Sequence, residues 1–167
     1  MIARSFVLLC SILPLATPFA LQAEDLSRPV PACPLTSLEG GKGYDLQQLK
    51  GKVIYIDFWA SWCASCAKSF PYLNQLHEAY KDKGLQVIGI NMDESGQDAK
   101  AFLNNHAAQF SVAADASKQC AANFAMEAMP ATYLIDKKGF IRHVHLGFRA
   151  GETADLQQKV EQLLAER

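Results

Sequence analysis

Clusters of apolar residues along the chain predict the strands of a sheet. Residues 53–58 read Val-Ile-Tyr-Ile-Asp-Phe, and a nearly continuous apolar run of this kind is typical of a strand buried on both faces. Residues 85–90 and 131–135 have a similar character. Residues 136–139 read Asp-Lys-Lys-Gly and predict a tight turn into a further strand over 140–146.

Between these strands, apolar residues recur at helical spacing and predict helices. A helix is expected from residue 63 to about residue 81, with Gly84 as its stop. Ser95 begins a second helix that runs to about residue 105, and a shorter one is expected over 118–124. The expected apolar faces are Phe70, Leu73, Leu76, His77 and Tyr80 in the first helix, Ala101, Phe102 and Ala108 in the second, and Leu156, Val160, Leu163 and Leu164 in a closing helix from Thr153.

The order of these elements predicts the fold class. Strand, helix and strand over residues 53–90 indicate a parallel pair joined by a right-handed crossover. The sequence therefore predicts an α/β protein with one central mixed sheet and helices on both faces. With 167 residues and no internal repeat, the chain fits a single domain.

Composition and charge narrow the classes of function. Hydrophobic residues make up 50% of the chain and charged residues 20%, which excludes a disordered chain. Lys and Arg number 16 against 17 Asp and Glu, so the chain lacks the positive field that holds a nucleic acid backbone. No nucleic acid partner is expected.

Residues 1–23 differ in composition from the rest of the chain. Arg4 precedes an apolar run from Phe6 to Leu21, and Ala23 offers a small residue for cleavage. This is the pattern of a secretory signal peptide. The alternative is a retained membrane anchor, but the run of about 16 residues is shorter than the roughly 20 that a spanning helix needs.

Export sets the expected organisation and redox environment of the remaining chain. We expect a periplasmic protein with a flexible lead over residues 24–34 and a folded domain over residues 35–167. Thiols outside the cytosol tend to form disulfides. The cysteines that remain after cleavage are Cys33, Cys63, Cys66 and Cys120.

The strongest local signal is Trp-Ala-Ser-Trp-Cys-Ala-Ser-Cys at residues 59–66, where a buried strand meets a helix. Cysteines separated by two residues at a helix start lie one turn apart and can close a disulfide. Cys63 lies at the helix N-terminus, where unpaired backbone N–H groups and the helix dipole favour its thiolate. We therefore expect Cys63 to attack a disulfide and Cys66 to resolve the mixed disulfide.

A structural zinc site or an inert disulfide would use the same pair. Zinc needs two further ligands, and the close histidine pair available is His143 and His145. Histidines on strands are more often structural than metal-binding, so no metal is expected. An inert disulfide does not explain why two tryptophans flank the pair, and redox chemistry is favoured.

Together these segments resemble the exported TlpA-like (ResA/DsbE-like) group of thioredoxin-fold proteins. The resemblance covers about residues 30–165 and implies a thioredoxin fold, a central mixed β-sheet flanked by helices, with a TlpA-like N-terminal extension and βα insertion. It also implies thiol-disulfide oxidoreductase activity with the cysteine pair as the redox group and no other cofactor. The matching segments are Leu-Lys-Gly-Lys at 49–52, Phe-Trp-Ala-Ser-Trp-Cys at 58–63, Phe-Pro at 70–71, Met-Pro at 129–130 and the hairpin over 139–147.

The resemblance implies roles for further residues. Pro130 matches the family's cis-proline, which lies against the cysteine pair and offers backbone groups to an extended substrate strand. Asp57 matches the buried acid of cytoplasmic thioredoxins, which handles the proton when Cys66 attacks, and burial raises the pKa of such a carboxyl. Trp59 and Trp62 are expected to line the apolar surface around the reactive cysteine, with core packing as the alternative for Trp59. The residues expected to contact the substrate are Trp62, Ala64, Ser65 and Met129.

Three segments depart from the family pattern. Ala64 and Ser65 stand between the cysteines where thioredoxin has Gly-Pro, and that dipeptide influences the reduction potential. Many TlpA-like proteins carry a glutamate three residues after the second cysteine, where this chain has Ser69. Residues 128–132 read Ala-Met-Pro-Ala-Thr, whereas cytochrome c maturation members often show Gly-x-Pro-Glu-Thr around the cis-proline. This departure argues against a dedicated role in cytochrome c maturation, which is kept only as an alternative.

Cys33 and Cys120 form the second candidate pair. Some relatives bring these regions together, and a structural disulfide between them would pin the N-terminal segment. The alternative is one buried and one exposed free thiol.

The expected function is reduction of disulfides in exported proteins by Cys63 and Cys66. By resemblance, the electron donor is a membrane thiol reductase. A disulfide-forming oxidase is the first alternative, since it uses the same fold and cysteines at a higher reduction potential. A copper chaperone of the thioredoxin fold is the second. It would bind copper with both cysteines and a histidine such as His143 or His145, although such proteins typically separate their cysteines by three residues.

Overall fold

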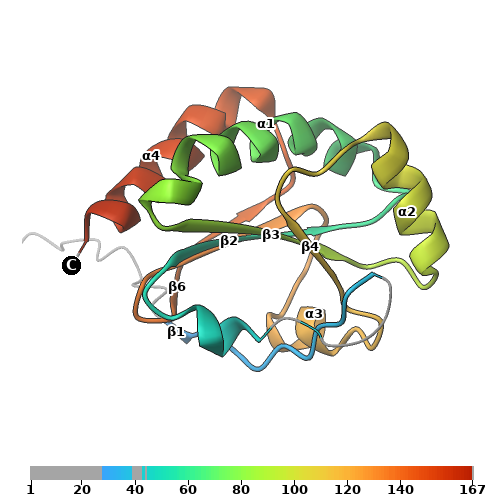
Figure 1. Ribbon diagram of the computed structural model, residues 1–167, viewed down its shortest axis with the longest axis horizontal. Helices are drawn as coiled ribbons and strands as arrows, with labels where there is room; N and C mark the ends of the chain where they lie inside the picture. Colours follow the sequence, from blue (N-terminus) through green and yellow to red (C-terminus); the bar gives the residue numbers. More distant parts are fainter. Residues whose placement is uncertain (1–27, 39–42, 44, 167) are drawn as a thin grey trace, which may run out of the picture.

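The described residues form a six-stranded mixed sheet that lies between two layers of helices (Figure 1). The computed structural model describes residues 28–38, 43 and 45–166. The strand order is β1-β6-β5-β2-β3-β4, so β2 lies near the middle. The strands are β1 (Arg28–Pro29), β2 (Val53–Trp59), β3 (Leu85–Asn91), β4 (Ser111–Ala114), β5 (Ala131–Ile135) and β6 (Phe140–Leu146).

Helices α1, α2 and α4 pack on one face of the sheet, and α3 and the 3-10 turn η1 pack on the other (Figure 1). The prediction of an α/β fold with helices on both faces is confirmed. The helices are α1 (Ala64–Tyr80), α2 (Gly96–Asn105), α3 (Gln119–Asn123) and α4 (Thr153–Ala165), and the 3-10 turns are η1 (Leu46–Leu49), η2 (Lys81–Lys83) and η3 (Ala150–Glu152).

The central strand has the environment that its sequence predicts. Every residue of β2 is buried. β2 pairs in parallel with β3 and antiparallel with β5, which confirms the strand, helix and strand unit. Cys63 is the N-cap of α1, and Gly84 ends the following 3-10 turn at a φ of 99°, a backbone conformation that glycine adopts without strain.

An aromatic cluster on each face holds the layers together. Trp59, Phe70 and Phe102 contact one another between the sheet, α1 and α2. Phe58 and Phe124 meet edge to face on the opposite side, where α3 covers the sheet. Edge-to-face packing is the arrangement that aromatic rings prefer.

Two features differ from the sequence prediction. Strand β4 was not expected, because it has only four residues, Ser-Val-Ala-Ala, and little β-branched character. Ala101 was expected on the apolar side of α2 but is exposed, and Ala99 is buried with Phe102 instead. Ala99 and Phe102 are three residues apart and share a helix face, whereas Ala101 points elsewhere.

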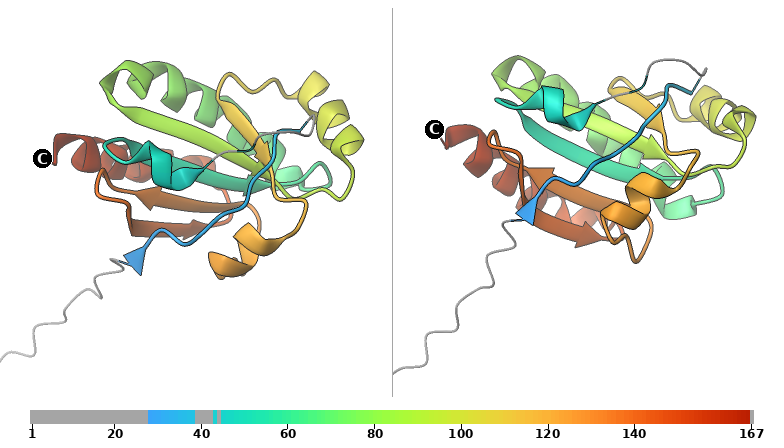
Figure 2. Two further views of the ribbon diagram at one scale, coloured as in Figure 1. Left: turned by 60° about the horizontal axis from the view of Figure 1, so that its bottom comes forward. Right: turned by 90° about the horizontal axis from the view of Figure 1, so that it is seen from below.

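The N-terminal segment crosses the sheet from edge to edge beside α3 (Figure 2). β1 pairs with β6 at one edge, and Thr36 bridges Ala114 of β4 at the other. The expected signal peptide, residues 1–23, and residues 24–27 of the expected lead (24–34) lie outside the described residues. Within residues 28–38, 43 and 45–166, no helix has the length and apolar character needed to cross a membrane.

A disulfide between Cys33 and Cys120 ties this segment to α3. The Cα atoms of the two cysteines are 4.4 Å apart. Two hydrogen bonds reinforce the link, because Asn123 Nδ2 donates to Ala32 O at 2.8 Å and Arg28 Nη2 donates to Phe124 O at 2.7 Å. The disulfide closes a loop with a sequence separation of 87, which strongly restricts the unfolded chain.

Replacing Cys33 and Cys120 with serine is expected to lower the free energy of unfolding by about 2 to 4 kcal/mol, because the unfolded chain regains the freedom of a long loop. Urea unfolding measures this when the replacement is made in a Cys63→Ser/Cys66→Ser background, which isolates the second pair. Alkylation without reduction provides the check, since two labels on residues 24–167 of the Cys63→Ser/Cys66→Ser protein, which lack Cys10, would show that no second disulfide exists.

Candidate active site

The cysteine pair lies where β2 passes into α1. Cys63 has extended backbone and caps the helix, and its Sγ accepts a hydrogen bond from the backbone N–H of Cys66 at 3.2 Å. The two cysteines form a disulfide with an S–S distance of 2.04 Å. The sulfur of Cys63 therefore sits at the helix N-terminus, where a thiolate is stabilised after reduction.

Access distinguishes the two sulfurs. Cys63 retains 6% of its surface and Cys66 retains none. Ser65 Oγ lies 3.5 Å from Cys63 Sγ, so a hydroxyl stands beside this sulfur. Ala64 is exposed and Ser65 is half-buried at the start of the helix. The arrangement suits Cys63 for attack on an external disulfide and Cys66 for a reaction inside the protein.

The two tryptophans of the motif have different environments. Trp62 is 71% exposed directly before Cys63. Trp59 is fully buried and contacts Phe70 and Phe102, so the expectation that it lines the surface around the cysteine is wrong. Trp59 ends β2, a strand without a solvent-facing side, and its side chain belongs to the core.

Asp93 holds the turn between β2 and the cysteines. Its carboxylate accepts from the backbone N–H of Ser61 at 3.0 and 3.1 Å and from Ser61 Oγ at 2.9 Å. Asn91 Nδ2 donates to the same carboxylate at 2.8 Å, and Lys118 Nζ donates to the carbonyl oxygens of Met92 and Asp93. The end of β3 therefore fixes the backbone just before Cys63. The sequence analysis missed Asp93, because its partner is 32 residues away.

Pro130 follows a cis peptide bond, Met129–Pro130. Pro130 is buried, and its carbonyl accepts from the N–H of Gly147 at 2.8 Å. Met129 is half-buried and packs against the apolar cluster that contains Cys63 and Cys66. The loop before β5 and the cysteine pair thus share one apolar environment.

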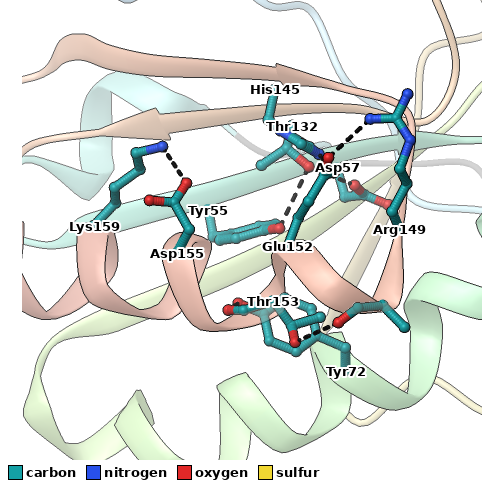
Figure 3. A network of polar contacts seen from close by, with 11 residues as sticks. Tyr55, Asp57, Tyr72, Thr132, His145, Arg149, Glu152, Thr153, Asp155 and Lys159 are labelled. Atoms are coloured by element: carbon teal, nitrogen blue, oxygen red, sulfur yellow. Dashed lines mark hydrogen bonds and ion pairs between the residues drawn. The ribbon is translucent and has the colours of Figure 1, made fainter.

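Asp57 is a buried acid on β2. It is 1% exposed, and burial raises the pKa of its carboxyl from 3.8 to about 7, although hydrogen bonds from Thr132 and Ser69 oppose this shift. Thr132 Oγ1 donates to Asp57 Oδ1 at 3.0 Å (Figure 3). Ser69 Oγ lies 3.4 Å from Asp57 Oδ2 and 2.9 Å from the carbonyl oxygen of Cys66, so it links the acid to the cysteine turn.

The other sequence candidates lie elsewhere. His143 and His145 are on β6, which β5 separates from β2. His145 Nε2 lies 3.1 Å from Glu152 Oε2. In the described part of the chain, no three His, Cys, Asp or Glu side chains gather in a way that could hold a metal ion. Thr132 was missed as a partner of Asp57, because the contact depends on the register between β2 and β5.

Comparison with known proteins gives consistent matches. Residues 26–161 match the Redoxin family. A thiol-disulfide oxidoreductase ResA of Bacillus thuringiensis (strain Al Hakam) is 34% identical over 130 residues, which are 78% of this chain and 75% of the relative. The ResA of Bacillus subtilis (strain 168) is 31% identical over 107 residues, 64% of this chain and 60% of that protein.

Solved structures agree with these matches. A Chlorobium tepidum protein given the name thiol:disulfide interchange protein DsbE has a TM-score of 0.80 and 37% identity, covering 84% of this chain and 99% of that chain. The thioredoxin domain of a thiol-disulfide oxidoreductase from Bacteroides vulgatus has a TM-score of 0.73 and 27% identity, with coverage of 83% and 97%.

Replacing Asp57 with asparagine is expected to remove a loss of stability at high pH. The pKa of Asp57 is about 7 in the folded protein against an ordinary value of 3.8, so the folded state holds a proton that the unfolded chain releases between these values. Stability therefore falls as the pH rises through this window and levels off above about pH 7. At about 1.4 kcal/mol per pKa unit, the full effect is roughly 4 kcal/mol.

Denaturant unfolding of both proteins near pH 4 and near pH 8 measures the effect. The free energy of unfolding should fall less from pH 4 to pH 8 for Asp57→Asn than for the unmodified protein. Stability curves that stay parallel from pH 4 to pH 8 would show that the carboxyl does not titrate in this window.

Proposed function

Because the chain belongs to the Redoxin family and is a thioredoxin-fold thiol-disulfide oxidoreductase, we propose that Cys63 and Cys66 are its redox-active pair and reduce disulfides in exported proteins. The observation that carries this proposal is the Cys63–Cys66 disulfide at the N-terminus of α1, with the more accessible sulfur capping the helix. The cis bond before Pro130 and the buried carboxyl of Asp57 support it.

The first step is attack by the Cys63 thiolate on one sulfur of a substrate disulfide. A bond forms between Cys63 Sγ and that sulfur, and the other substrate sulfur leaves as a thiolate. Two features favour the thiolate, namely the helix N-terminus and the hydrogen bond from the Cys66 N–H. The fixed turn at Ser61, held by Asp93, keeps the attacking sulfur in place.

The second step releases the substrate. Asp57 takes the thiol proton of Cys66, and the resulting thiolate attacks Cys63 Sγ. The bond from Cys63 to the substrate breaks, the substrate leaves with two thiols, and Cys63 and Cys66 form the disulfide. A carboxyl with a pKa of about 7 suits this transfer near neutral pH, because it both accepts and returns a proton.

Substrate binding is assigned to the surface around Cys63. Trp62 and Ala64 are exposed there, Ser65 is half-buried beside the sulfur, and Met129 belongs to the same apolar cluster. An extended substrate segment would lie along the loop before Pro130 and use its backbone groups. Exposed apolar side chains next to a reactive sulfur suit partly unfolded protein substrates.

The proposal also states where the protein acts and which class of partner reduces its cysteine pair. The apolar segment within residues 1–23 supports export to the periplasm. A reductase there needs electrons from the cytoplasm, and a membrane thiol reductase is the class of partner that would supply them. The cysteine pair itself carries the electrons, so the mechanism uses no further cofactor.

Separate replacement of the two cysteines tests the order of attack. Cys63→Ser should abolish reduction of a protein disulfide with dithiothreitol as donor, because the attacking sulfur is lost. Cys66→Ser should accumulate a mixed disulfide with the substrate, visible by mass spectrometry without reduction. Cys33→Ser/Cys120→Ser serves as the control and should retain activity. A Cys63→Ser protein that still turns over is incompatible with this mechanism.

The reduction potential of the Cys63–Cys66 pair tests the direction of electron flow. Equilibration with dithiothreitol or glutathione buffers should give a value near about −270 mV, as in thioredoxin, if the protein is a reductase. A value near about −120 mV, the region of the strong oxidant DsbA, would instead assign the protein as a disulfide-forming oxidase.

A further inference from the structure

Lys118 occupies an unusual position for a lysine, at the start of α3. Its φ of 59° and ψ of 8° lie in the left-handed region, which a residue with a side chain rarely adopts. Lys118 is also the N-cap of α3, where Ser, Thr, Asp or Asn is preferred, and its side chain makes no capping hydrogen bond. Both features are locally unfavourable. A backbone outlier of this kind points to a contact elsewhere that compensates for it.

The side chain of Lys118 reaches the segment that follows β3. Its Nζ donates to the carbonyl oxygen of Met92 and, at 3.2 Å, to that of Asp93. Asp93 is 8% exposed, so the segment that receives these hydrogen bonds is largely shielded from water. An ammonium group has several N–H donors, and one that donates to two neighbouring carbonyl groups fixes both peptide units at once.

The peptide units that Lys118 holds carry the carboxylate that positions the cysteine turn. Both oxygens of Asp93 accept from the backbone N–H of Ser61, at 3.0 and 3.1 Å. The N–H of Cys63 donates to Ala60 O at 3.1 Å, so a tight turn leads into α1 with Ser61 as its second residue. A change in the position of Asp93 therefore moves the turn that ends at Cys63.

The backbone of Lys118 is itself held in place. Its N–H donates to Asp115 O at 3.0 Å, and its carbonyl accepts from the N–H of Ala122 at 3.1 Å. Asp115 is fully buried, and its carboxylate accepts from the N–H of Ala121 at 2.8 Å and from Ser117 Oγ at 3.2 Å. Lys118 thus links α3, on one face of the sheet, to the turn that leads into α1 on the other face (Figure 1).

We propose that Lys118 is a positioning residue for the attack by Cys63. Its ammonium fixes the segment after β3, the carboxylate of Asp93 then holds Ser61, and the turn keeps the sulfur of Cys63 at the N-terminus of α1. This inference rests on the proposed function, in which Cys63 attacks the substrate disulfide as a thiolate. Lys118 acts through position, because its hydrogen bonds go to backbone carbonyl groups.

Ala125 provides a matched control. In the part of the chain that the structure describes, Lys118 and Ala125 are the non-glycine residues with a positive φ. Lys118 directly precedes α3, and Ala125, with a φ of 53°, follows its C-cap. Glycine adopts this conformation without strain, so Ala125→Gly relieves the same kind of backbone strain without removing a polar side chain. It should leave the reactivity of Cys63 unchanged.

The rate at which the thiolate of Cys63 displaces iodide from iodoacetamide measures the proposed role. The reduced protein is labelled across a range of pH values, and mass spectrometry of its peptides separates the label on Cys63 from that on the other cysteines. Lys118→Met keeps the apolar stem and removes the donors. It should slow the reaction near neutral pH by at least about threefold, because the thiolate loses its alignment with the helix N-terminus. The pH profile of the reaction should move to higher pH for the same reason.

Three further variants separate the hydrogen bonds of Lys118 from a general effect on folding. Lys118→Arg keeps a cation with several N–H donors and should restore the reaction. Lys118→Gly removes the donors together with the backbone strain, so it should keep the start of α3 folded and still react slowly. In an Asp93→Ala protein, which already lacks the carboxylate that holds Ser61, adding Lys118→Met should cause little further loss.

The outcomes separate this proposal from the proposed function. If Lys118→Gly reacts at the unmodified rate, if Lys118→Arg is as slow as Lys118→Met, or if Ala125→Gly is equally slow, the role of Lys118 is overturned while attack by Cys63 stands. Full additivity of the losses in Lys118→Met and Asp93→Ala also overturns it, because the effect then does not pass through Asp93. If the label appears on Cys66 instead of Cys63, the order of attack in the proposed function fails, and this inference fails with it.

Discussion

Complete burial of β2 is the constraint on which the rest of this structure depends. A strand with no exposed face needs hydrogen-bonded neighbours on both sides and a helical layer over each surface. β3 and β5 are the neighbours, and α1 and α3 belong to the two layers. The chain emerges from this burial at Ser61 and Trp62, directly before Cys63. The cysteine pair therefore lies at the boundary between a rigid core and solvent.

The same burial governs the chemistry of the acid on β2. Burial raises the pKa of the Asp57 carboxyl to about 7, which suits the proposed proton transfer to and from Cys66 near neutral pH. Burial also separates that carboxyl from water, so each change of its charge depends on polar neighbours. Thr132 and Ser69 are these neighbours, one on β5 and one on α1. The register between β2 and β5 therefore decides which hydroxyl lies beside Asp57 on the sheet.

Local chemistry explains which features the sequence could predict. The apolar run of β2, the cap at Cys63 and the stop at Gly84 are local signals, and the structure has all of them. The contact between Asp57 and Thr132 is set by register between strands 75 residues apart, and no local pattern records it. β4 escaped prediction for a related reason, since its four residues become a strand only by pairing with β3.

Serine at position 69 leaves Asp57 as the acid that the proposed mechanism uses. The TlpA-like group often has a glutamate here, and a glutamate beside Asp57 would place two carboxyls in one dry site, where they titrate as a coupled pair. Ser69 does not titrate at neutral pH, and its hydrogen bond to Asp57 favours the carboxylate. In the proposed mechanism Asp57 therefore handles the proton of Cys66 without a second carboxyl at position 69. Ser69 lies against one oxygen of the Asp57 carboxyl and Thr132 against the other, so one hydroxyl from α1 and one from β5 oppose the effect of burial on the pKa of this acid.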